Sequence, residues 1–435
     1  SNTTRVRASD DDMRTPRISP DGRHIIWEEK VDGEDWEIFR TENPAGGGGG
    51  VDSIGTMISQ MPEQTKSDLV ISEHGRYSAF LSSLGESPEV YLYDRETGML
   101  RQLTENTLVE SDLQMATDGS VLAWEQAESG GNGVPRTVIY DIGNQQYLEF
   151  HDFSQLEAIS ADGSGIWLEN PSAVYNLEDR AYLFNVGGPI AVSHDLRRFL
   201  YEESDSLYVY DYESHNRLHV AVQDIGYIEP QMDISGEIVL YHFETESDME
   251  RVKLYNTSTG SELVVYEGPL SDNEEFREML MGDDGNAVYY NLEFYDPDEV
   301  YSGYAWYRYD AESGNTVMID STDGSHEIND PDLSANGRIF TYTKTVQTEP
   351  YIQDIFYYDH QSGTTTQLTN DAASDRNSVI SSDGSTLIWE GETGTDSDAP
   401  TEVWQYQLFE PPTEIASETV GALPEKFVLS ANYPN

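Results

Sequence analysis

A strand–turn–strand pattern that recurs along the whole chain constrains its fold more than any other feature. It appears as PRISPDGRHIIWEE at 16–29 and returns, among other places, as DLVISEHGRYSAFLSS at 68–83 and NSVISSDGSTLIWEG at 377–391. Alternating apolar and polar residues give such a strand one buried side and one outer side. Asp-Gly and Asn-Gly pairs supply the positive φ that tight hairpin turns require. The pattern therefore predicts a series of β-hairpins.

A second signature, an aromatic residue followed by an acid or amide and a turn, marks a further strand in each unit. Examples are YDRETG, YNTSTG and YDHQSG. Four-stranded units of ~40–50 residues without helical periodicity are typical of a β-propeller. Between Gly163 and Gly236, where one turn glycine is missing, the SHDL turn at 193–196 places Leu196 in the glycine position. We therefore predict an all-β fold with a single β-propeller over residues 1–409.

The two ends of the repeat region predict how the ring closes. The N-terminal stretch NTTRVRASDDDMRTPRIS aligns with TTTQLTNDAASDRNSVIS at 364–381, so residues 3–8 resemble a fourth strand without three strands before it. The last unit, after Gly384, lacks a fourth strand of its own. We expect the N-terminal strand to complete the last blade, because this pairing removes both open edges. This gives nine four-stranded blades, or eight if 155–189 is not a full blade.

The repeats resemble the TolB-type propeller repeat. The motif SPDG occurs at 19–22, and SADG and SSDG are close variants. The resemblance implies architecture rather than activity, because this repeat serves scaffolds, lyases and peptidase gates. Some TolB-type propellers are pectin-fragment lyases that hold a metal with channel histidines, but the nine histidines of this chain match no such cluster.

The C-terminal segment carries information on the location of the protein. Residues 410–422 form a predicted linker, and LPEKFVLSANYPN at 423–435 resembles the opening of a type A sorting domain of type IX secretion. The further strands of that family are absent from this sequence. The resemblance implies passage through the type IX secretion machinery and an extracellular or outer cell-surface location, either tethered or released.

The charge balance limits the partners. The sequence has 81 acidic and 24 basic residues, a net charge of −57, and only five of the basic residues are lysine. Such a chain repels nucleic acid and anionic membranes. It favours adaptation to high salt, with an ordinary acidic secreted protein as the alternative. We expect the melting temperature to rise between 0.1 and 2 M NaCl, because salt screens self-repulsion. No apolar run is long enough for membrane insertion.

The turn aspartates and glycines have two interpretations, a ring of ligands or a set of structural turns. Recurrence from blade to blade favours the structural role, in which the carboxylate accepts hydrogen bonds from backbone N–H groups. The residues to which we assign this role are Asp21, Gly22, Asp118, Gly119, Asp162, Gly163, Asp383 and Gly384.

The insert NLEFYDPDEVYSGYAWYRYD at 291–310 is the most distinctive segment. Its aromatic rings suit stacking on a sugar or anchoring a protein, and we take Tyr295, Tyr301 and Tyr304 as candidate ligand contacts. Asp296 and Asp298 are a candidate calcium site, since calcium prefers closely spaced oxygen ligands. The alternative is that Tyr304 packs within its strand.

No motif in the chain requires catalysis: G-x-S-x-G and a phosphate loop are both absent. The leading prediction is a secreted or cell-surface, non-enzymatic binding or scaffold module for an extracellular protein or glycan. One alternative is a structural subunit that assembles with copies of itself into a surface layer or filament. Another is a polysaccharide hydrolase or lyase with carboxylates at the channel mouth.

Overall fold

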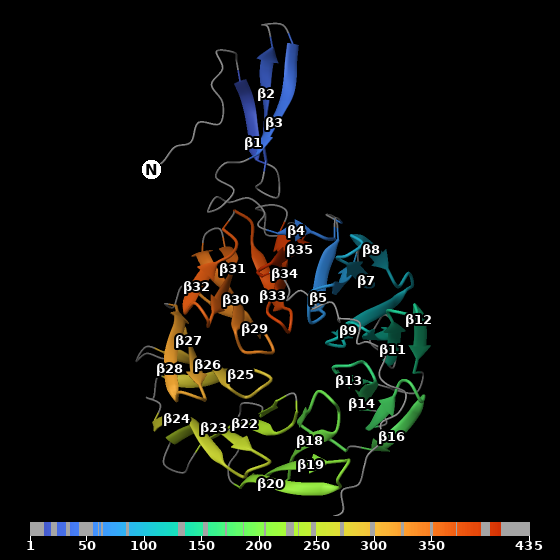
Figure 1. Cartoon of the computed structure of the whole chain (residues 1–435), viewed down its shortest axis with the longest axis vertical. Coiled ribbons are helices and arrows are strands. Elements are labelled where there is room, and N and C mark those ends of the chain that lie inside the picture. Colours follow the sequence, from blue (N-terminus) through green and yellow to red (C-terminus); the bar gives the residue numbers. More distant parts are fainter. Residues whose placement is uncertain are drawn as a thin grey trace, which may run out of the picture.

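A computed structural model describes residues 13–18, 24–31, 35–42 and most of 55–409, with short gaps in the last range. This part of the chain contains strands and turns and no helix. Eight four-stranded antiparallel sheets form a ring of blades around a central axis (Figure 1). We call the region along this axis the central channel. The predicted all-β propeller is thus confirmed, with eight blades. Within the described residues, no helix has the length and apolarity to span a membrane.

The blades follow one another along the chain, and each runs from an inner first strand to an outer fourth strand. Blades 1 to 4 consist of β5 (Thr65–Ile71), β6 (Tyr77–Ser83), β7 (Glu89–Asp94), β8 (Met99–Gln102), β9 (Leu108–Met115), β10 (Val121–Glu128), β11 (Arg136–Asp141), β12 (Gln146–Glu149), β13 (Leu156–Ile159), β14 (Gly165–Leu168), β15 (Ala173–Asn176), β16 (Ala181–Asn185), β17 (Ala191–Val192), β18 (Arg198–Glu202), β19 (Ser206–Asp211) and β20 (Asn216–Val222). Blades 5 to 8 consist of β21 (Gln231–Met232), β22 (Ile238–Glu244), β23 (Met249–Asn256), β24 (Glu262–Pro269), β25 (Glu274–Met281), β26 (Ala287–Tyr295), β27 (Tyr301–Asp310), β28 (Asn315–Ser321), β29 (Ile328–Leu333), β30 (Ile339–Thr348), β31 (Tyr351–Asp359), β32 (Thr364–Gln367), β33 (Asp375–Ile380), β34 (Thr386–Glu392), β35 (Thr401–Gln407) and β4 (Thr56–Met57).

A strand that precedes blade 1 closes the ring, as predicted. This strand is β4, which pairs with β35 through Met57 opposite Trp404 and Thr56 opposite Gln405. We assigned this role to residues 3–8, which lie outside the described residues. That assignment was wrong, because β4 occupies the open edge of β35. At the same junction the buried Lys66 ammonium lies 3.2 Å from the buried Glu402 carboxylate. Blades 8 and 1 are therefore joined by a strand pair and a buried ion pair.

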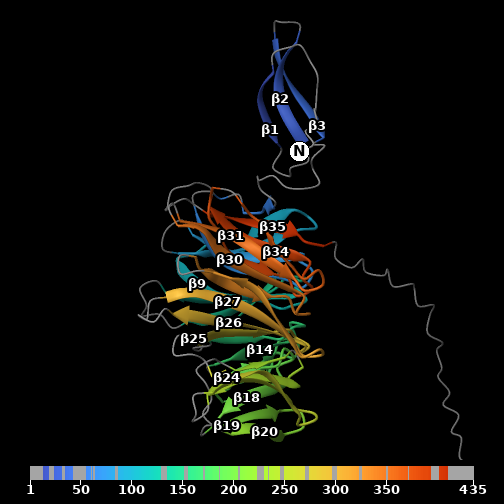
Figure 2. The ribbon, with the colours of Figure 1, turned by 90° about the vertical axis from the view of Figure 1, so that its left-hand side faces the viewer.

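The first repeat, residues 13–42, differs from the prediction. Its strands β1 (Met13–Ile18), β2 (His24–Val31) and β3 (Asp35–Glu42) form a separate three-stranded sheet, drawn outside the ring in Figures 1 and 2. In chain order β4 would be its fourth strand, but β4 pairs with blade 8. The sequence left open whether 155–189 is a full blade. This stretch holds the complete blade β13–β16. Eight blades result because the first repeat is not one of them.

The core lies between neighbouring blades. One apolar cluster joins Leu81 and Leu92 of blade 1 to Leu122 and Trp124 of blade 2. Second strands such as β10 are buried along a continuous run, because a blade is covered on both faces. This explains why the second strands read as FL, LAW and LIW rather than as a strict alternation.

The first turn of each blade packs against the blade before it. A Cβ atom at Gly337, whose φ is +64°, would lie 2.7 Å from Ala287 Cβ of the preceding blade. Blade 4 carries Leu196 at this position with a φ of 55°. Its side chain is 2% exposed, and its Cδ1 would lie 3.5 Å from a Cβ added at Gly165. The Leu196 side chain therefore fills the interface with the preceding blade, at the position where other blades carry a turn glycine.

Candidate binding site in the central channel

The inner strands of several blades carry a β-bulge with a residue in the left-handed region. These residues are Asp68 (φ 51°), Asp112 (51°), Asp330 (49°) and Asn377 (53°), and the strand register shifts around each of them. Asp and Asn tolerate this conformation better than most residues. Figure 1 shows β5, β9, β29 and β33 next to the middle of the ring. The bulges therefore place short polar side chains at the channel.

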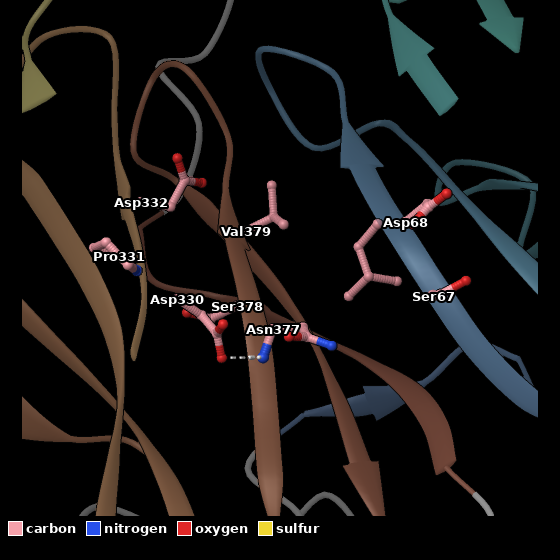
Figure 3. A pocket seen from close by; sticks show the side chains of 9 residues that line it. Ser67, Asp68, Asp330, Pro331, Asp332, Asn377, Ser378 and Val379 are labelled. Atoms are coloured by element: carbon pink, nitrogen blue, oxygen red, sulfur yellow. Dashed lines mark hydrogen bonds between the residues drawn. The ribbon is translucent and has the colours of Figure 1, made fainter. Parts of the chain in front are cut away.

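Three of these bulges, on β5, β29 and β33, surround one cavity of about 420 Å³ (Figure 3). This volume is within the usual range for small-molecule sites, about 300–1,000 Å³. Inter-blade hydrogen bonds fix its wall: Asn377 N–H donates to Asp330 Oδ2 at 3.2 Å, and Ile380 N–H donates to Asp332 Oδ2 at 2.8 Å. The lining residues are Ser67, Asp68, Leu69, Asp330, Pro331, Asp332, Asn377, Ser378 and Val379.

Two acids of the cavity have raised pKa values, although Asp332 is only half-buried and Asp68 is exposed. Burial raises the pKa of Asp332 to about 6, although backbone N–H groups of Ile380 and Leu333 oppose the rise. Burial, and then the neighbouring Asp112, raises the pKa of Asp68. Charging these carboxyls inside the fold is therefore unfavourable, and a positive ligand would reduce this penalty.

Two further acids stand behind the lining. Burial raises the pKa of Glu390 on β34 to about 7, against a hydrogen bond from Asn377 and the charge of Arg376. Burial, and then Asp330, raises the pKa of Glu278 on β25. The acidic character thus extends beyond the residues that touch the cavity.

Two buried polar atoms at this site lack hydrogen-bond partners among the described residues. They are the Oγ atom of Ser378, which lines the cavity, and the Oε1 atom of Glu390. Ser378 is 3% exposed and Glu390 is 2% exposed. Buried polar groups in folded proteins nearly always have a partner, protein or otherwise. The Ser378 hydroxyl therefore has hydrogen-bonding capacity that a ligand or a water molecule reaching it would satisfy.

The tyrosines predicted to contact a ligand lie on β26 and β27 of blade 6, and none of them lines this cavity. Tyr295 at the end of β26 pairs with Tyr301 at the start of β27, and Tyr304 pairs with Glu293. Burial, and then the Glu293 carboxylate, raises the pKa of Tyr304. The side chains of Tyr295 and Tyr301 lie outside the described residues, as do Asp296 and Asp298. The calcium site stays a prediction.

The turn aspartates make local hydrogen bonds. Asp118 Oδ1 accepts the N–H of Ser120 at 2.8 Å. Asp162 Oδ1 accepts the N–H of Ser164 at 3.0 Å and the hydroxyl of Ser160 at 2.8 Å. Burial acts to raise the pKa of Asp162, but these hydrogen bonds outweigh it and hold the pKa below its ordinary value.

Asp383 has the same arrangement with an additional partner. Its Oδ1 accepts the N–H of Ser385 and the hydroxyl of Ser381, each at 2.8 Å, and its Oδ2 lies 2.8 Å from His74 Nδ1 of blade 1. Burial opposes these bonds, yet the pKa of Asp383 is lowered. The φ values of Gly119, Gly163 and Gly384 are 73°, 65° and 74°. Asp21 and Gly22 lie outside the described residues.

The described histidines do not converge on the channel cavity. His74 lies in a turn of blade 1, His242 on β22 and His360 after β31. Within the described residues, no group of three or more His, Asp or Glu side chains could hold a metal ion.

The sequence did carry a signal for the bulge residues, which we did not use. Asp68, Asp112, Asp330 and Asn377 each lie four residues before the first residue of the turn. An alignment of the repeats on their turns would have placed these residues together. The meeting of three bulges around one cavity depends on the order of the blades and has no local signal.

Comparison with known proteins supports the fold. No protein-family model matches the sequence, and no curated protein matches it. A solved prolyl endopeptidase is 10% identical, with a TM-score of 0.51, over 77% of this chain and 55% of that one. An oligogalacturonate lyase in complex with manganese is 14% identical, with a TM-score of 0.44, over 78% and 88% of the two chains. The β-propeller domain of the trilobed protease from Pyrococcus furiosus is 15% identical, with a TM-score of 0.46, over 71% and 98%. The first likeness shows the propeller fold alone, and this chain spans about half of that endopeptidase chain.

Proposed function

We propose that this protein is an extracellular β-propeller that binds a ligand at its central channel without transforming it. The observation that carries the proposal is the cavity of about 420 Å³ between β5, β29 and β33. Residues of three blades line this cavity, among them Ser378, whose buried Oγ atom has no hydrogen-bond partner among the described residues. Propellers commonly recruit side chains from several blades to one ligand, so such a cavity suits a binding module.

A polysaccharide hydrolase or lyase is the second candidate. The cavity holds two carboxyls with raised pKa values, Asp332 and Asp68, and glycosidases use such a pair as acid and base. Against this role, Asp332 Oδ2 already accepts the N–H of Ile380. Asp68 stands at a bulge whose conformation by itself favours Asp. Both carboxyls therefore have a structural explanation, and binding is the better-supported function.

The extracellular location rests on sequence. Residues 423–435 resemble the start of a type IX sorting domain, and the acidic composition suits a salty medium. The partners that we propose are an extracellular protein, a glycan or a small solute. A structural subunit that polymerises with its own copies is the competing proposal.

One set of experiments separates these functions. The full chain in 2 M NaCl is analysed by sedimentation at several concentrations, and is then tested for binding and for product release on an array of glycans and small amines. We expect a monomer and saturable binding without product. Ordered polymers would identify a structural subunit. Release of sugar fragments that is lost in Asp332→Asn would identify an enzyme and overturn the proposal.

A further inference from the structure

We infer that the cavity between β5, β29 and β33 binds an organic cation, a molecule that carries alkylammonium or guanidinium groups. This inference rests on the proposed binding function and names the class of its ligand. It follows from the charge, the spacing and the apolar surface of the lining residues.

The cavity is acidic on every strand that faces it except β33. Asp68 comes from β5, and Asp330 and Asp332 come from β29. None of the nine lining residues is basic. The lining therefore carries three acidic residues and no basic residue.

The charged groups behind the lining do not reverse this balance. Glu278 and Glu390 add two acids, and Arg376 lies 3.7 Å from Glu390. Lys66 is buried 3.2 Å from Glu402 and is engaged there. Each base behind the lining therefore has an acid of its own, and the three lining carboxyls remain uncompensated within the described residues.

The spacing favours an extended cation over a bare metal ion. Asp68 stands on β5, apart from Asp330 and Asp332 on β29, and no three acidic or histidine side chains gather to hold a metal within the described residues. The volume of about 420 Å³ far exceeds the ~30 Å³ that one water molecule fills in the liquid. A molecule with two or three separated ammonium groups can reach several carboxyls at once.

Hydrogen-bonding capacity and apolar surface match the same ligand. An ammonium group has three N–H donors and a guanidinium has five, and the Ser378 Oγ atom is an acceptor that lacks a partner among the described residues. Leu69, Pro331 and Val379 line the cavity between the polar groups. Methylene stems pack on such surface while their charged ends reach the acids.

The test is isothermal titration of the full chain with spermidine, a linear triamine, in 0.15 M and in 2 M NaCl. We expect saturable binding with one site, which is weakened but kept in 2 M NaCl because partly buried charge pairs are screened less than exposed ones. Asp68→Asn preserves the bulge, since Asn377 occupies the same position in blade 8. Combined with Asp330→Asn, it should weaken binding at least about tenfold, as expected for hydrogen bonds to charged groups.

Two further variants complete the design. Ser378→Ala should weaken binding by about threefold to tenfold, the effect of one lost hydrogen bond. Asp179→Asn, in the exposed turn between β15 and β16, removes the same charge away from the cavity and should leave the affinity within twofold. Melting curves in the same buffer verify that each variant is folded.

Three results would overturn the inference. The first is the absence of saturable binding, or binding that disappears in 2 M NaCl, since attraction to the acidic surface explains the latter. The second is an equal loss of affinity in the cavity variants and in Asp179→Asn. The third is saturable binding of a neutral glycan that Ser378→Ala weakens while spermidine does not compete. This third result keeps the proposed binding function and rejects only the cation, whereas polymers or product release reject the function itself.

Discussion

Two sets of aspartates recur in the blades, one in the first turn and one at the inner-strand bulge, and the same residue type behaves differently in each. Asp162 and Asp383 in the turns accept backbone N–H and hydroxyl groups, and their pKa values are lowered. Asp68 at a bulge, on the same kind of hairpin, has a raised pKa because burial dominates. The supply of local donors therefore decides whether an aspartate stabilises the fold or faces the channel as an unfavourable charge.

Asp332 combines a feature of the turn aspartates with a feature of the bulge aspartates. It shows whether backbone hydrogen bonds or desolvation has the larger effect on the pKa. It accepts N–H groups from Ile380 and Leu333, as a turn aspartate does, yet its pKa rises to about 6. Two backbone donors do not outweigh the desolvation of this half-buried carboxyl. The comparison thus separates the turn acids, which hold the blades together, from the cavity acids, which we assign to binding.

The largest expected effect that tests this comparison is the pH dependence of stability. Asp332 and Glu390 have folded-state pKa values of about 6 and about 7, so each destabilises the fold while charged, and this penalty disappears as the pH falls. Glu110, with a pKa of about 7, acts in the same direction. The buried His242, with a pKa of about 4, opposes it, because the unfolded chain binds a proton there first. For these four groups together we expect the free energy of unfolding to rise by about 3–4 kcal/mol from pH 8 to pH 5.

Asp162 and Asp383 have lowered pKa values, and their contribution is lost below about pH 4. Urea unfolding at constant 2 M NaCl measures both parts of the pH profile. A free energy of unfolding that falls steadily from pH 8 to pH 5 would contradict the raised pKa values of Asp332 and Glu390.

Removal of a turn acid comes next in size. Asp383→Ala leaves the N–H of Ser385 and the hydroxyl of Ser381 without their acceptor and removes the contact with His74. We expect the free energy of unfolding to fall by about 2–3 kcal/mol, since each net hydrogen bond contributes roughly 1 kcal/mol. Urea unfolding at pH 7 measures it, with Asp179→Asn as the surface control. A loss no larger than that of the control would show that the turn bonds are not structural.

Neutralising a cavity acid should have the opposite sign. Asp332→Asn keeps an oxygen that can accept the Ile380 N–H but removes the enclosed charge. We expect stabilisation by about 2 kcal/mol at pH 8 and no difference at pH 4, where the native carboxyl is already protonated. Thermal melts at the two pH values test this expectation. Destabilisation at pH 8 would place Asp332 with the turn acids.

The smallest effect concerns the bulge itself. Asp68→Asn should change the free energy of unfolding by less than about 0.5 kcal/mol, because Asn accepts the left-handed conformation. Asp68→Ala should cost about 1 kcal/mol for the same backbone reason. The pair of variants, compared by urea unfolding, separates the conformational role of Asp68 from its charge. Equal losses in both would mean that the carboxylate itself stabilises the fold.

Much of the fold could be predicted from the sequence because hairpin turns and apolar runs are local signals. Even the exceptional turn at Leu196 was placed in this way. The closing strand could not be assigned to its residues, because several short segments fit an open sheet edge equally well and only the assembled ring selects among them. The structure selects Thr56 and Met57 beside β35, which leaves β1–β3 as a separate sheet.

The candidate site was harder to predict for the same reason. The aromatic insert at 291–310 is distinctive in composition. Asp68, Asp332 and Ser378 have no distinguishing sequence signal among 81 acidic residues and many serines. Only the ring brings residues of blades 7, 8 and 1 to one cavity. This arrangement also determines how far each side chain is buried. Burial in turn raises the pKa of Asp332 and leaves the Ser378 hydroxyl without a partner among the described residues.

The most direct measurement of the central claim is the number of protons exchanged when spermidine binds at pH 6, obtained by titration calorimetry in two buffers of different ionisation enthalpy. At this pH spermidine is fully charged and Asp332, with a pKa of about 6, is about half protonated. A cation in the cavity favours the ionised carboxyls, so binding should release about half a proton or more, and Asp332→Asn should reduce this release. Binding without proton release, or with a release that Asp332→Asn leaves unchanged, would contradict the claim that these enclosed acids form the binding site.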